Sequence, residues 1–273
     1  MNVFRAQIEY IREVHPEARR MGLGAPRISR NARPGQFYMV RPGDEGDPYL
    51  PRPFTLFRRG LEGVAAGGEG DGLEIFYQIV GRGTRLLSRM GVGQRVDVLG
   101  PLGHGWDWVP GRDVVLVGGG IGVASLVSLA EGLPPTQRAM ACALVGARTA
   151  DRLWGVEDLR RSGVTVHTAV EAEGHAFQGT VLDLMEDRRD ELLGKDPALY
   201  VCGPPGMLKG VAQWARSEGI PCQVSLESPM ACGVGVCLGC SVRASGGAEY
   251  LRVCQEGPVF DARAIDWEAW SGR

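Results

Sequence analysis

Four cysteines in the last fifth of the chain have a spacing that could bind iron. Cys232, Cys237 and Cys240 share one glycine-rich segment and Cys254 follows in a strand-like stretch, which gives the pattern C-x4-C-x2-C-x13-C. Three thiolates from a tight loop and a fourth from a later segment form the ligand arrangement of a plant-type [2Fe–2S] cluster. The interleaved glycines fit, because a loop that directs N–H groups at sulfides must turn sharply. The spacing predicts these four cysteines as cluster ligands.

A zinc site is the main alternative for the same four thiolates. Structural zinc sites usually pair their cysteines as two short C-x2-C units, and here only Cys237 and Cys240 have that spacing. The other three cysteines, Cys142, Cys202 and Cys222, lie in apolar strand-like contexts that favour burial as small hydrophobic side chains. Cys202 is a special case, because a glycine turn follows it directly.

Two glycine-rich turns could bind a dinucleotide. Residues 114–117 form an apolar run that leads into Gly118, Gly119, Gly120 and Gly122 and then into a helical stretch. A second apolar run ends in Cys202-Gly203-Pro204. Glycines let the backbone approach a pyrophosphate, and a helix N-terminus supplies N–H donors. The strict G-x-G-x-x-G pattern is absent, so close packing of strand and helix remains an alternative.

A cation and a second helix start could hold another diphosphate in the first third of the chain. Arg52-Pro53-Phe54-Thr55 places a guanidinium and a hydroxyl at the start of a predicted strand, and Gly83-Thr84 lies at the start of a predicted helix. A guanidinium beside a helix N-terminus suits a diphosphate. An ordinary surface arginine and a helix-capping threonine would explain either segment alone.

The elements that position these residues divide the chain into three predicted units. Residues 1–105 alternate apolar and polar residues in short runs between Gly and Pro, which predicts a small antiparallel barrel. Residues 106–226 alternate apolar runs with helical stretches, which predicts a parallel sheet covered on both faces. Residues 227–273 have little hydrophobic periodicity and form the predicted cluster segment and tail. Within the first unit, residues 60–72 predict a flexible hairpin loop.

Composition excludes several classes of protein. The 273 residues are 44% hydrophobic and 23% charged, which is typical of a globular chain and not of a disordered one. A formal net charge of −2 makes nucleic acid an unexpected partner. The uncharged run at residues 114–130 is slightly short for a membrane span and is broken by glycines. Arg5 and Glu9 stand where an export signal would be apolar, so we expect a cytoplasmic protein.

These motifs, in this order, resemble those of the ferredoxin-reductase family of flavoproteins. Arg52-Pro53-Phe54-Thr55 resembles its R-x-[YF]-[ST] flavin motif, and the two glycine turns resemble its pyridine-nucleotide motifs. The resemblance implies a six-stranded antiparallel FAD-binding barrel and an NAD(H)-binding α/β domain. The positions it assigns to the flavin are Arg52, Pro53, Phe54, Thr55, Phe76, Tyr77, Gln78, Gly83 and Thr84. Those it assigns to NAD are Gly118, Gly119, Gly120, Gly122, Cys202, Gly203 and Pro204.

The cysteine segment narrows the resemblance to the electron-transfer subunits of class 1B dihydroorotate dehydrogenase, the PyrK family. That likeness implies one FAD and one [2Fe–2S] cluster per subunit, with NAD+ or NADH as co-substrate. It also implies an FMN-containing catalytic partner subunit of the PyrD type, in a heterotetramer with two of each chain, acting in pyrimidine (UMP) biosynthesis. Electrons would pass from the partner's FMN through the cluster and FAD to NAD+. Ser228-Pro229 and the expanded 60–72 loop depart from the family pattern.

Other functions stay open from the sequence. The same architecture would suit the reductase of an oxygenase, or the diaphorase subunit of a hydrogenase or transhydrogenase. A zinc-stabilised interaction module without enzyme activity is a further alternative. Redox cofactors need no side-chain acid, base or nucleophile, so no catalytic residue is predicted. The acidic residues Glu157, Asp158 and Asp187 are expected on solvated helix surfaces. Both an arginine and an aspartate, Arg148 and Asp151, follow the second predicted strand of the middle unit, so the choice between NAD and NADP stays open.

Overall fold

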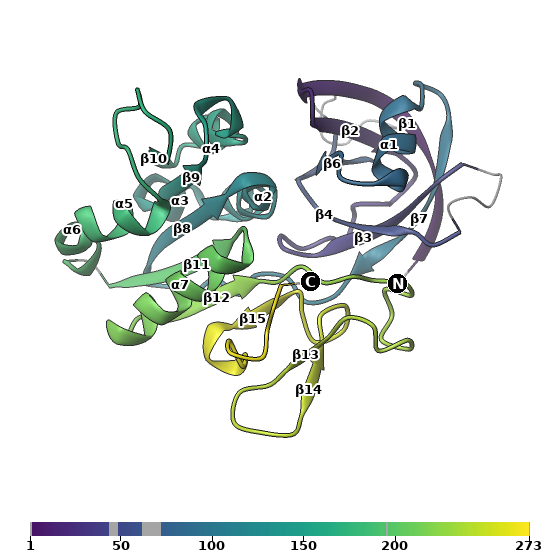
Figure 1. The fold of residues 1–273 in the computed structure, drawn as a ribbon. Coiled ribbons are helices and arrows are strands. Elements are labelled where there is room, and N and C mark those ends of the chain that lie inside the picture. The colour runs from purple at the N-terminus through teal and green to yellow at the C-terminus, as the bar shows by residue number, and fades with distance from the viewer. Residues whose placement is uncertain (1, 44–48, 62–71, 195, 273) are drawn as a thin grey trace.

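The first part of the chain folds into an antiparallel half-barrel (Figure 1). The computed structural model describes residues 2–43, 49–61, 72–194 and 196–272. The strands pair in the order β4-β3-β7-β1-β2-β6-β5. They are β1 (Asn2–His15), β2 (Ala18–Gly24), β3 (Phe37–Pro42), β4 (Arg52–Thr55), β5 (Arg58–Arg59), β6 (Gly72–Gln78) and β7 (Arg95–Leu102), and helix α1 (Arg82–Arg89) links β6 to β7.

The predicted antiparallel barrel is confirmed, with seven strands instead of six. The additional strand is β5, whose two residues are too few to show an alternating pattern. In β7 the pattern is clear, because Val96, Val98, Gly100 and Leu102 are buried in turn and the residues between them are not. Most of the predicted loop at residues 60–72 lies outside the described residues.

The middle part of the chain forms the predicted parallel sheet, with helices on both faces. Its strand order is β10-β9-β8-β11-β12-β15. The parallel strands are β8 (Asp113–Gly119), β9 (Cys142–Ala147), β10 (Thr165–Val170), β11 (Pro197–Cys202) and β12 (Cys222–Ser225). The α-helices are α2 (Val123–Gly132), α3 (Pro135–Met140), α4 (Val156–Arg161), α5 (Val181–Asp187), α6 (Arg189–Leu193) and α7 (Pro205–Ser217), and two short 3-10 helices are η1 (Gly120–Gly122) and η2 (Ala150–Arg152).

Alternate residues of each parallel strand enter two different cores. In β8, Val115 and Val117 pack with α5 and α7 on one face, and Val114 and Leu116 pack with α2 and α4 on the other. Burial on both faces explains why these strands read as continuous apolar runs in the sequence. The carboxyl ends of the strands lie at one edge of the sheet, where both glycine turns follow.

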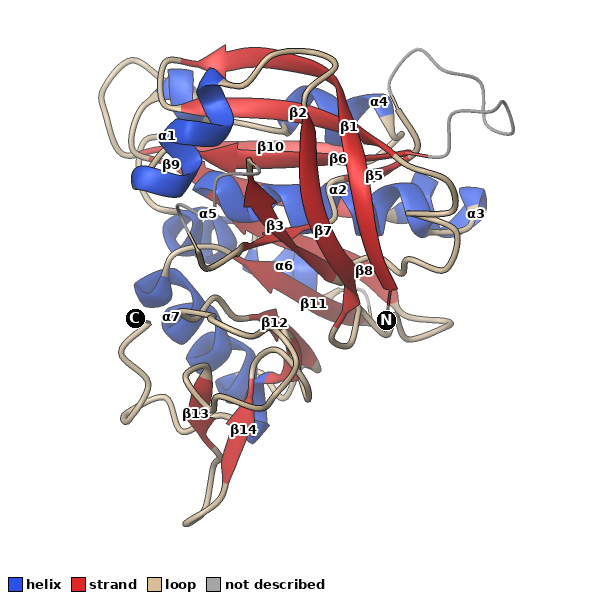
Figure 2. Ribbon diagram, turned by 90° about the vertical axis from the view of Figure 1, so that its right-hand side faces the viewer, coloured by secondary structure: helices blue, strands red, loops and turns tan. Residues whose placement is uncertain are grey.

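The cysteine-rich segment begins and ends at this same sheet. It leaves after β12 and returns as β15 (Val259–Asp261), which pairs antiparallel with β12 and makes the sheet mixed. Between them, β13 (Ser241–Arg243) and β14 (Tyr250–Arg252) form a hairpin that projects from the end of the molecule away from α1 (Figure 2). The 3-10 helix η3 (Ala262–Ala264) follows β15. The unit boundaries after residues 105 and 226 stay predictions.

The half-barrel and the mixed sheet meet through a group of buried ion pairs. Arg20 and Arg58 of the barrel contact Asp158 of α4, and Arg58 also contacts Glu131 of α2. Asp158 is only 3% exposed. The expectation of a solvated surface for Asp158 was therefore wrong, because its face of α4 packs against the barrel. No helix in the described part of the chain is long and apolar enough to cross a membrane.

Candidate functional site

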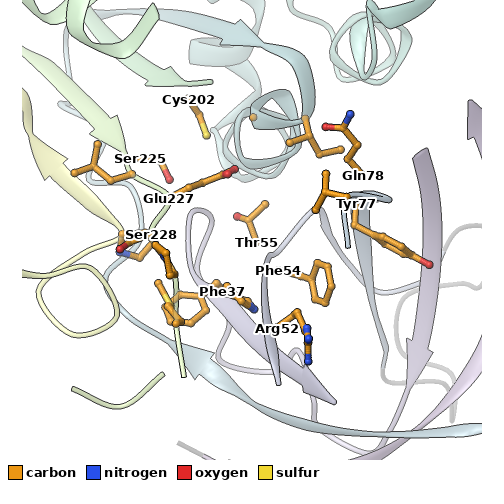
Figure 3. A pocket seen from close by; sticks show the side chains of 18 of the residues that line it. Phe37, Arg52, Phe54, Thr55, Tyr77, Gln78, Cys202, Ser225, Glu227 and Ser228 are labelled. Atoms are coloured by element: carbon orange, nitrogen blue, oxygen red, sulfur yellow. The ribbon is translucent and has the colours of Figure 1, made fainter. Parts of the chain in front are cut away.

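A cavity of about 440 Å³ lies between the half-barrel and the mixed sheet. Eight of the nine positions expected to hold flavin line it: Arg52, Pro53, Phe54, Thr55, Phe76, Tyr77, Gln78 and Thr84. From the other side it is lined by Gly122 and Cys202. Figure 3 shows the side chains of Thr55, Cys202 and Glu227 approaching the middle of the cavity from different sides. Residues from both the barrel and the sheet unit thus meet in one concave site.

The ninth flavin position, Gly83, acts through its lack of a side chain. A Cβ atom there would lie 2.3 Å from Nε of Arg52, so only glycine leaves room for this guanidinium beside the first turn of α1. Thr84 uses its hydroxyl within the helix start, where Oγ1 accepts hydrogen bonds from the N–H groups of Val80 and Gly81. A guanidinium next to an ordered helix N-terminus fits a diphosphate.

The glycines of the first turn have two roles: some allow close packing, and one leaves the backbone open to a ligand. A Cβ at Gly118 would lie 2.9 Å from a methyl group of Val123, and one at Gly122 would lie 2.6 Å from backbone atoms of Cys202. These two glycines allow α2 and the second turn to pack closely, as the packing alternative expected. Gly120 differs, because its φ is +54° and a Cβ atom there would have no neighbour within 4 Å. At Gly120 the backbone is open to a ligand.

A second cavity of about 460 Å³ lies over the carboxyl ends of the parallel strands. Gly119, Gly120 and Pro204 line it, and a smaller neighbouring cavity of about 230 Å³ is lined by these residues together with Gly122 and Gly203. Such a crevice at the strand ends is where open α/β sheets bind nucleotides. We call the two together the dinucleotide crevice. Gly118, which packs beneath the turn, is not among its lining residues.

Of the two residues that left the nucleotide choice open, only Arg148 lines the dinucleotide crevice. Asp151 does not line this crevice; its Oδ2 lies 3.0 Å from Nε2 of His15 at the end of β1. Glu171, which follows β10, lines the crevice as well. Arg148 and Glu171 therefore stand at the strand ends where the ribose of a dinucleotide would lie. Arg152 of η2, whose Nη2 lies 2.6 Å from Oε2 of Glu17, lines the same crevice.

Two proton-bearing groups approach the flavin cavity from the sheet side. Burial, and after it the nearby charge of Glu227, raises the pKa of the Cys202 thiol. Enclosure by surrounding protein likewise raises the pKa of the Glu227 carboxyl, although its side chain faces the cavity. Glu227 was not predicted from the sequence as a site residue. Its position directly after β12 and Leu226 was the available signal, because the same rule of strand ends pointed to Cys202.

The four predicted cluster cysteines come together as two pairs. Sγ of Cys240 lies 3.3 Å from Sγ of Cys254, and the backbone N–H of Cys237 donates to Sγ of Cys232. Within the described ranges, no three His, Cys, Asp or Glu side chains are close enough to hold one metal ion. Two thiol pairs fit two iron atoms with two ligands each better than a single tetrahedral zinc.

Backbone N–H groups in the cysteine loop already point at sulfur. Val234 and Cys237 donate to Sγ of Cys232, each at 3.4 Å, and Gly235 donates to Sγ of Cys254 at 3.1 Å. Burial opposes ionisation of Cys232, but the N–H groups outweigh it and lower its pKa to about 6. Gly233 and Gly235 adopt positive φ values of 69° and 80°, which directs these groups inward. The loop therefore fits a cluster whose sulfur atoms carry negative charge.

Comparison with known proteins agrees with this arrangement. Residues 227–266 match the family model described as the iron-sulfur cluster binding domain of dihydroorotate dehydrogenase B. The dihydroorotate dehydrogenase B (NAD+) electron transfer subunit of Desulforamulus reducens is 36% identical over 97% of this chain and 99% of its own. The chain belongs to this family. The corresponding subunit of Bacillus caldolyticus is 37% identical over 87% of this chain and 88% of its own. The chain is thus an oxidoreductase subunit.

Solved structures share the fold of this electron transfer subunit. The structure of an NADH-dependent reduced ferredoxin-NADP oxidoreductase, studied for flavin-based electron bifurcation, is 28% identical with a TM-score of 0.82 and covers 96% of this chain and 90% of its own. The ferredoxin reductase in carbazole 1,9a-dioxygenase is 20% identical with a TM-score of 0.63 over 81% of this chain and 67% of its own. The second likeness shows the fold alone.

Proposed function

We propose that this chain passes electrons between an FMN-containing dihydroorotate dehydrogenase catalytic subunit and NAD+, in pyrimidine biosynthesis. The observation that carries the proposal is the paired arrangement of Cys232, Cys237, Cys240 and Cys254 in a loop that packs against the half-barrel. The glycine at 233 would clash with Met39 of β3 if it carried a side chain, since its Cβ would lie 2.5 Å from Cγ. The cysteine loop therefore packs directly on the unit that forms the flavin cavity.

In this proposal the residues of the chain bind, orient and enclose the cofactors and the dinucleotide. Arg52 and the start of α1 would hold the flavin diphosphate, and Phe54 and Tyr77, whose rings lie 5.4 Å apart, would support it from the barrel. Gly120 and the start of α7 would receive the dinucleotide. The four cysteines would hold the cluster. One FAD and one [2Fe–2S] cluster per chain would supply the two-electron and one-electron chemistry when bound.

Cys202 and Glu227 would control protons at the centre of the site. Their raised pKa values favour the neutral form of both groups. A neutral thiol at Cys202 can donate a hydrogen bond into the cavity without placing negative charge beside a reduced cofactor, and burial shifts the Glu227 carboxyl in the same direction. The wall that they form would also exclude water from the point where the flavin cavity and the dinucleotide crevice meet.

The partner and the assembly belong to the same proposal. Membership of the family supports a catalytic partner subunit, and we propose a heterotetramer with two copies of each chain. A cytoplasmic location stays a prediction.

Reconstitution tests the proposal directly. The chain is mixed with an FMN-containing dihydroorotate dehydrogenase subunit, and NADH formation from dihydroorotate and NAD+ is followed by its near-ultraviolet absorbance. We expect activity that depends on both chains and that Cys232→Ser abolishes, because one iron would lose a ligand. Cys142→Ser is the matched control, since Cys142 lies in β9 away from the loop, and it should keep the activity.

Three results would overturn the proposal. Full activity in Cys232→Ser would exclude a route through the cysteine loop. Wild-type chain that contains zinc without iron or flavin would exclude electron transfer altogether. Activity only with an oxygenase, hydrogenase or ferredoxin-linked transhydrogenase partner would assign the chain to one of those systems instead.

A further inference from the structure

The boundary between the half-barrel and the mixed sheet contains five charged side chains that the proposed function does not use. Arg20 of β2, Arg58 of β5 and Glu74 of β6 belong to the barrel, and Glu131 of α2 and Asp158 of α4 belong to the sheet unit. Glu74 is fully buried and Asp158 nearly so. Removing ionised carboxylates from water costs stability unless close opposite charges compensate. These two carboxylates are buried at the boundary between two units, so they need compensating positive charges there.

The contacts of this group cross the boundary repeatedly. Arg20 Nη2 forms a hydrogen-bonded ion pair with Oδ2 of Asp158. Arg58 Nη2 lies 3.3 Å from Oδ1 of Asp158 and its Nη1 lies 3.3 Å from Oε2 of Glu74. Arg58 also lies 2.8 Å from Oε1 of Glu131. Asp158 thus receives both barrel arginines, one on each carboxylate oxygen, so its position relative to the barrel is fixed in direction as well as distance.

Arg20 connects this ion group to both cavities through aromatic rings. Its guanidinium carbon lies 4.6 Å from the ring centre of Phe57 and 5.5 Å from that of Phe76. Phe76 lines the flavin cavity and packs edge-on against Trp154 at 6.1 Å, and Trp154 lines the dinucleotide crevice. A shift of Arg20 or Asp158 would therefore move a wall of each cavity.

We infer that the Arg20–Asp158 pair is a positioning device that holds the dinucleotide crevice in register with the flavin cavity. The inference rests on the proposed function, since it concerns the approach of a dinucleotide to a flavin. An apolar contact of equal area would hold the two units together but would allow sliding, because hydrophobic contact has no direction. Pairing of one carboxylate with two guanidinium groups, one on each oxygen, favours a single arrangement.

The test compares two carboxylates of the same group. Asp158→Asn keeps the side-chain size and removes the charge that both arginines share. Glu131→Gln is the matched control, because the Glu131 carboxylate contacts Arg58 and is partly exposed. We expect Asp158→Asn to keep wild-type FAD and iron content but to slow flavin reduction at saturating NADH by roughly 10- to 100-fold, because the dinucleotide would no longer be held at one position relative to the flavin. Glu131→Gln should stay within about twofold of wild type.

A second readout does not depend on activity. Small-angle X-ray scattering of the loaded chain should give a larger radius of gyration and a broader distance distribution for Asp158→Asn than for wild type or Glu131→Gln. If Asp158→Asn does not fold, Arg20→Lys replaces it, because lysine keeps a charge near Asp158 but loses the planar contact with Phe76.

The outcomes separate positioning from general stability. A slower rate with altered scattering and full cofactor content supports the inference. An unchanged rate of flavin reduction together with unchanged scattering overturns the inference. So does a loss of rate that is fully explained by the fraction of protein that is unfolded or lacks FAD. If wild-type chain does not react with NADH at all, the proposed function fails, while the scattering comparison still tests whether the pair fixes the two units.

Discussion

The contact between the two glycine turns makes a sharp prediction for Gly122→Ala. A Cβ atom at Gly122 would lie 2.6 Å from C and O of Cys202 and 2.6 Å from N of Gly203. All three are backbone atoms of the second turn, so no side chain can rotate away to relieve the clash. Either η1 or the second turn must move to make room, which would open the dinucleotide crevice.

The size of the effect follows from the cost of overpacking. Forcing one methyl group into a packed site costs about 1–3 kcal/mol. If the ligand must restore the native turn to bind, this cost appears in its affinity as a weakening of roughly 5- to 150-fold. We expect the Kd for NAD+ to rise within this range in Gly122→Ala, with no added catalytic defect once the site is saturated.

Isothermal titration with NAD+ measures this change, and flavin absorbance checks that FAD is retained. Gly91→Ala is the matched control, because a Cβ at Gly91 meets nothing closer than 3.9 Å and its backbone is not left-handed. Wild-type affinity together with wild-type thermal stability in Gly122→Ala would refute the close packing of the two turns.

Further predictions concern the flavin site and the start of α5. Gly83→Ala should weaken FAD binding about tenfold by displacing the Arg52 guanidinium, a charged hydrogen-bond donor, and equal FAD retention on dilution in mutant and wild type would contradict this. Thr180→Ala should lower the free energy of unfolding by about 1 kcal/mol at neutral pH, because Thr180 caps α5 and exchanges hydrogen bonds with Asp183. Those hydrogen bonds lower the pKa of Asp183, so its contribution is complete above the unfolded pKa of about 3.9 and is lost as pH falls through the lower folded value. Urea unfolding from neutral to strongly acidic pH should therefore show the difference between the two proteins narrowing in acid. It should not vanish, because the N–H of Asp183 still donates to Oγ1 of Thr180 when the carboxyl is protonated, and a difference that does not change with pH would refute the assignment.

The parts of the molecule that sequence predicted are those encoded locally. The parallel strands have continuous apolar runs, and the cysteine loop has its ligands within one short segment. A tertiary arrangement is not needed to recognise either pattern. The same holds for α1 and α7, each of which begins directly after a glycine or proline turn.

The parts that sequence missed depend on contacts between distant segments. Asp158 lies on a short helix with charged neighbours, and nothing in that helix shows that one of its faces meets β2 and β5. Glu227 follows a strand that had been recognised, but the cavity in front of it exists only because the half-barrel closes the other side. β15 has three residues, too few for a periodic signal, and becomes a strand because β12 offers an unpaired edge.

The pairing of β15 with β12 has a consequence for how this protein could be modified. The N–H group of Leu226 donates to the carbonyl oxygen of Pro258 at 2.9 Å, so the two ends of the cysteine-rich segment are already in contact. In topological terms the segment is an insertion between neighbouring antiparallel strands, and a tight turn could join them in its place. A shortened chain that links β12 directly to β15 should keep the larger cavity of the dinucleotide crevice, whose lining residues all lie outside the removed stretch. It would lose all four iron ligands together with Glu227 and the neighbouring residues that line one side of the flavin cavity. The iron-binding segment can thus be exchanged without interrupting the sheet, but its replacement must also supply one side of the flavin cavity.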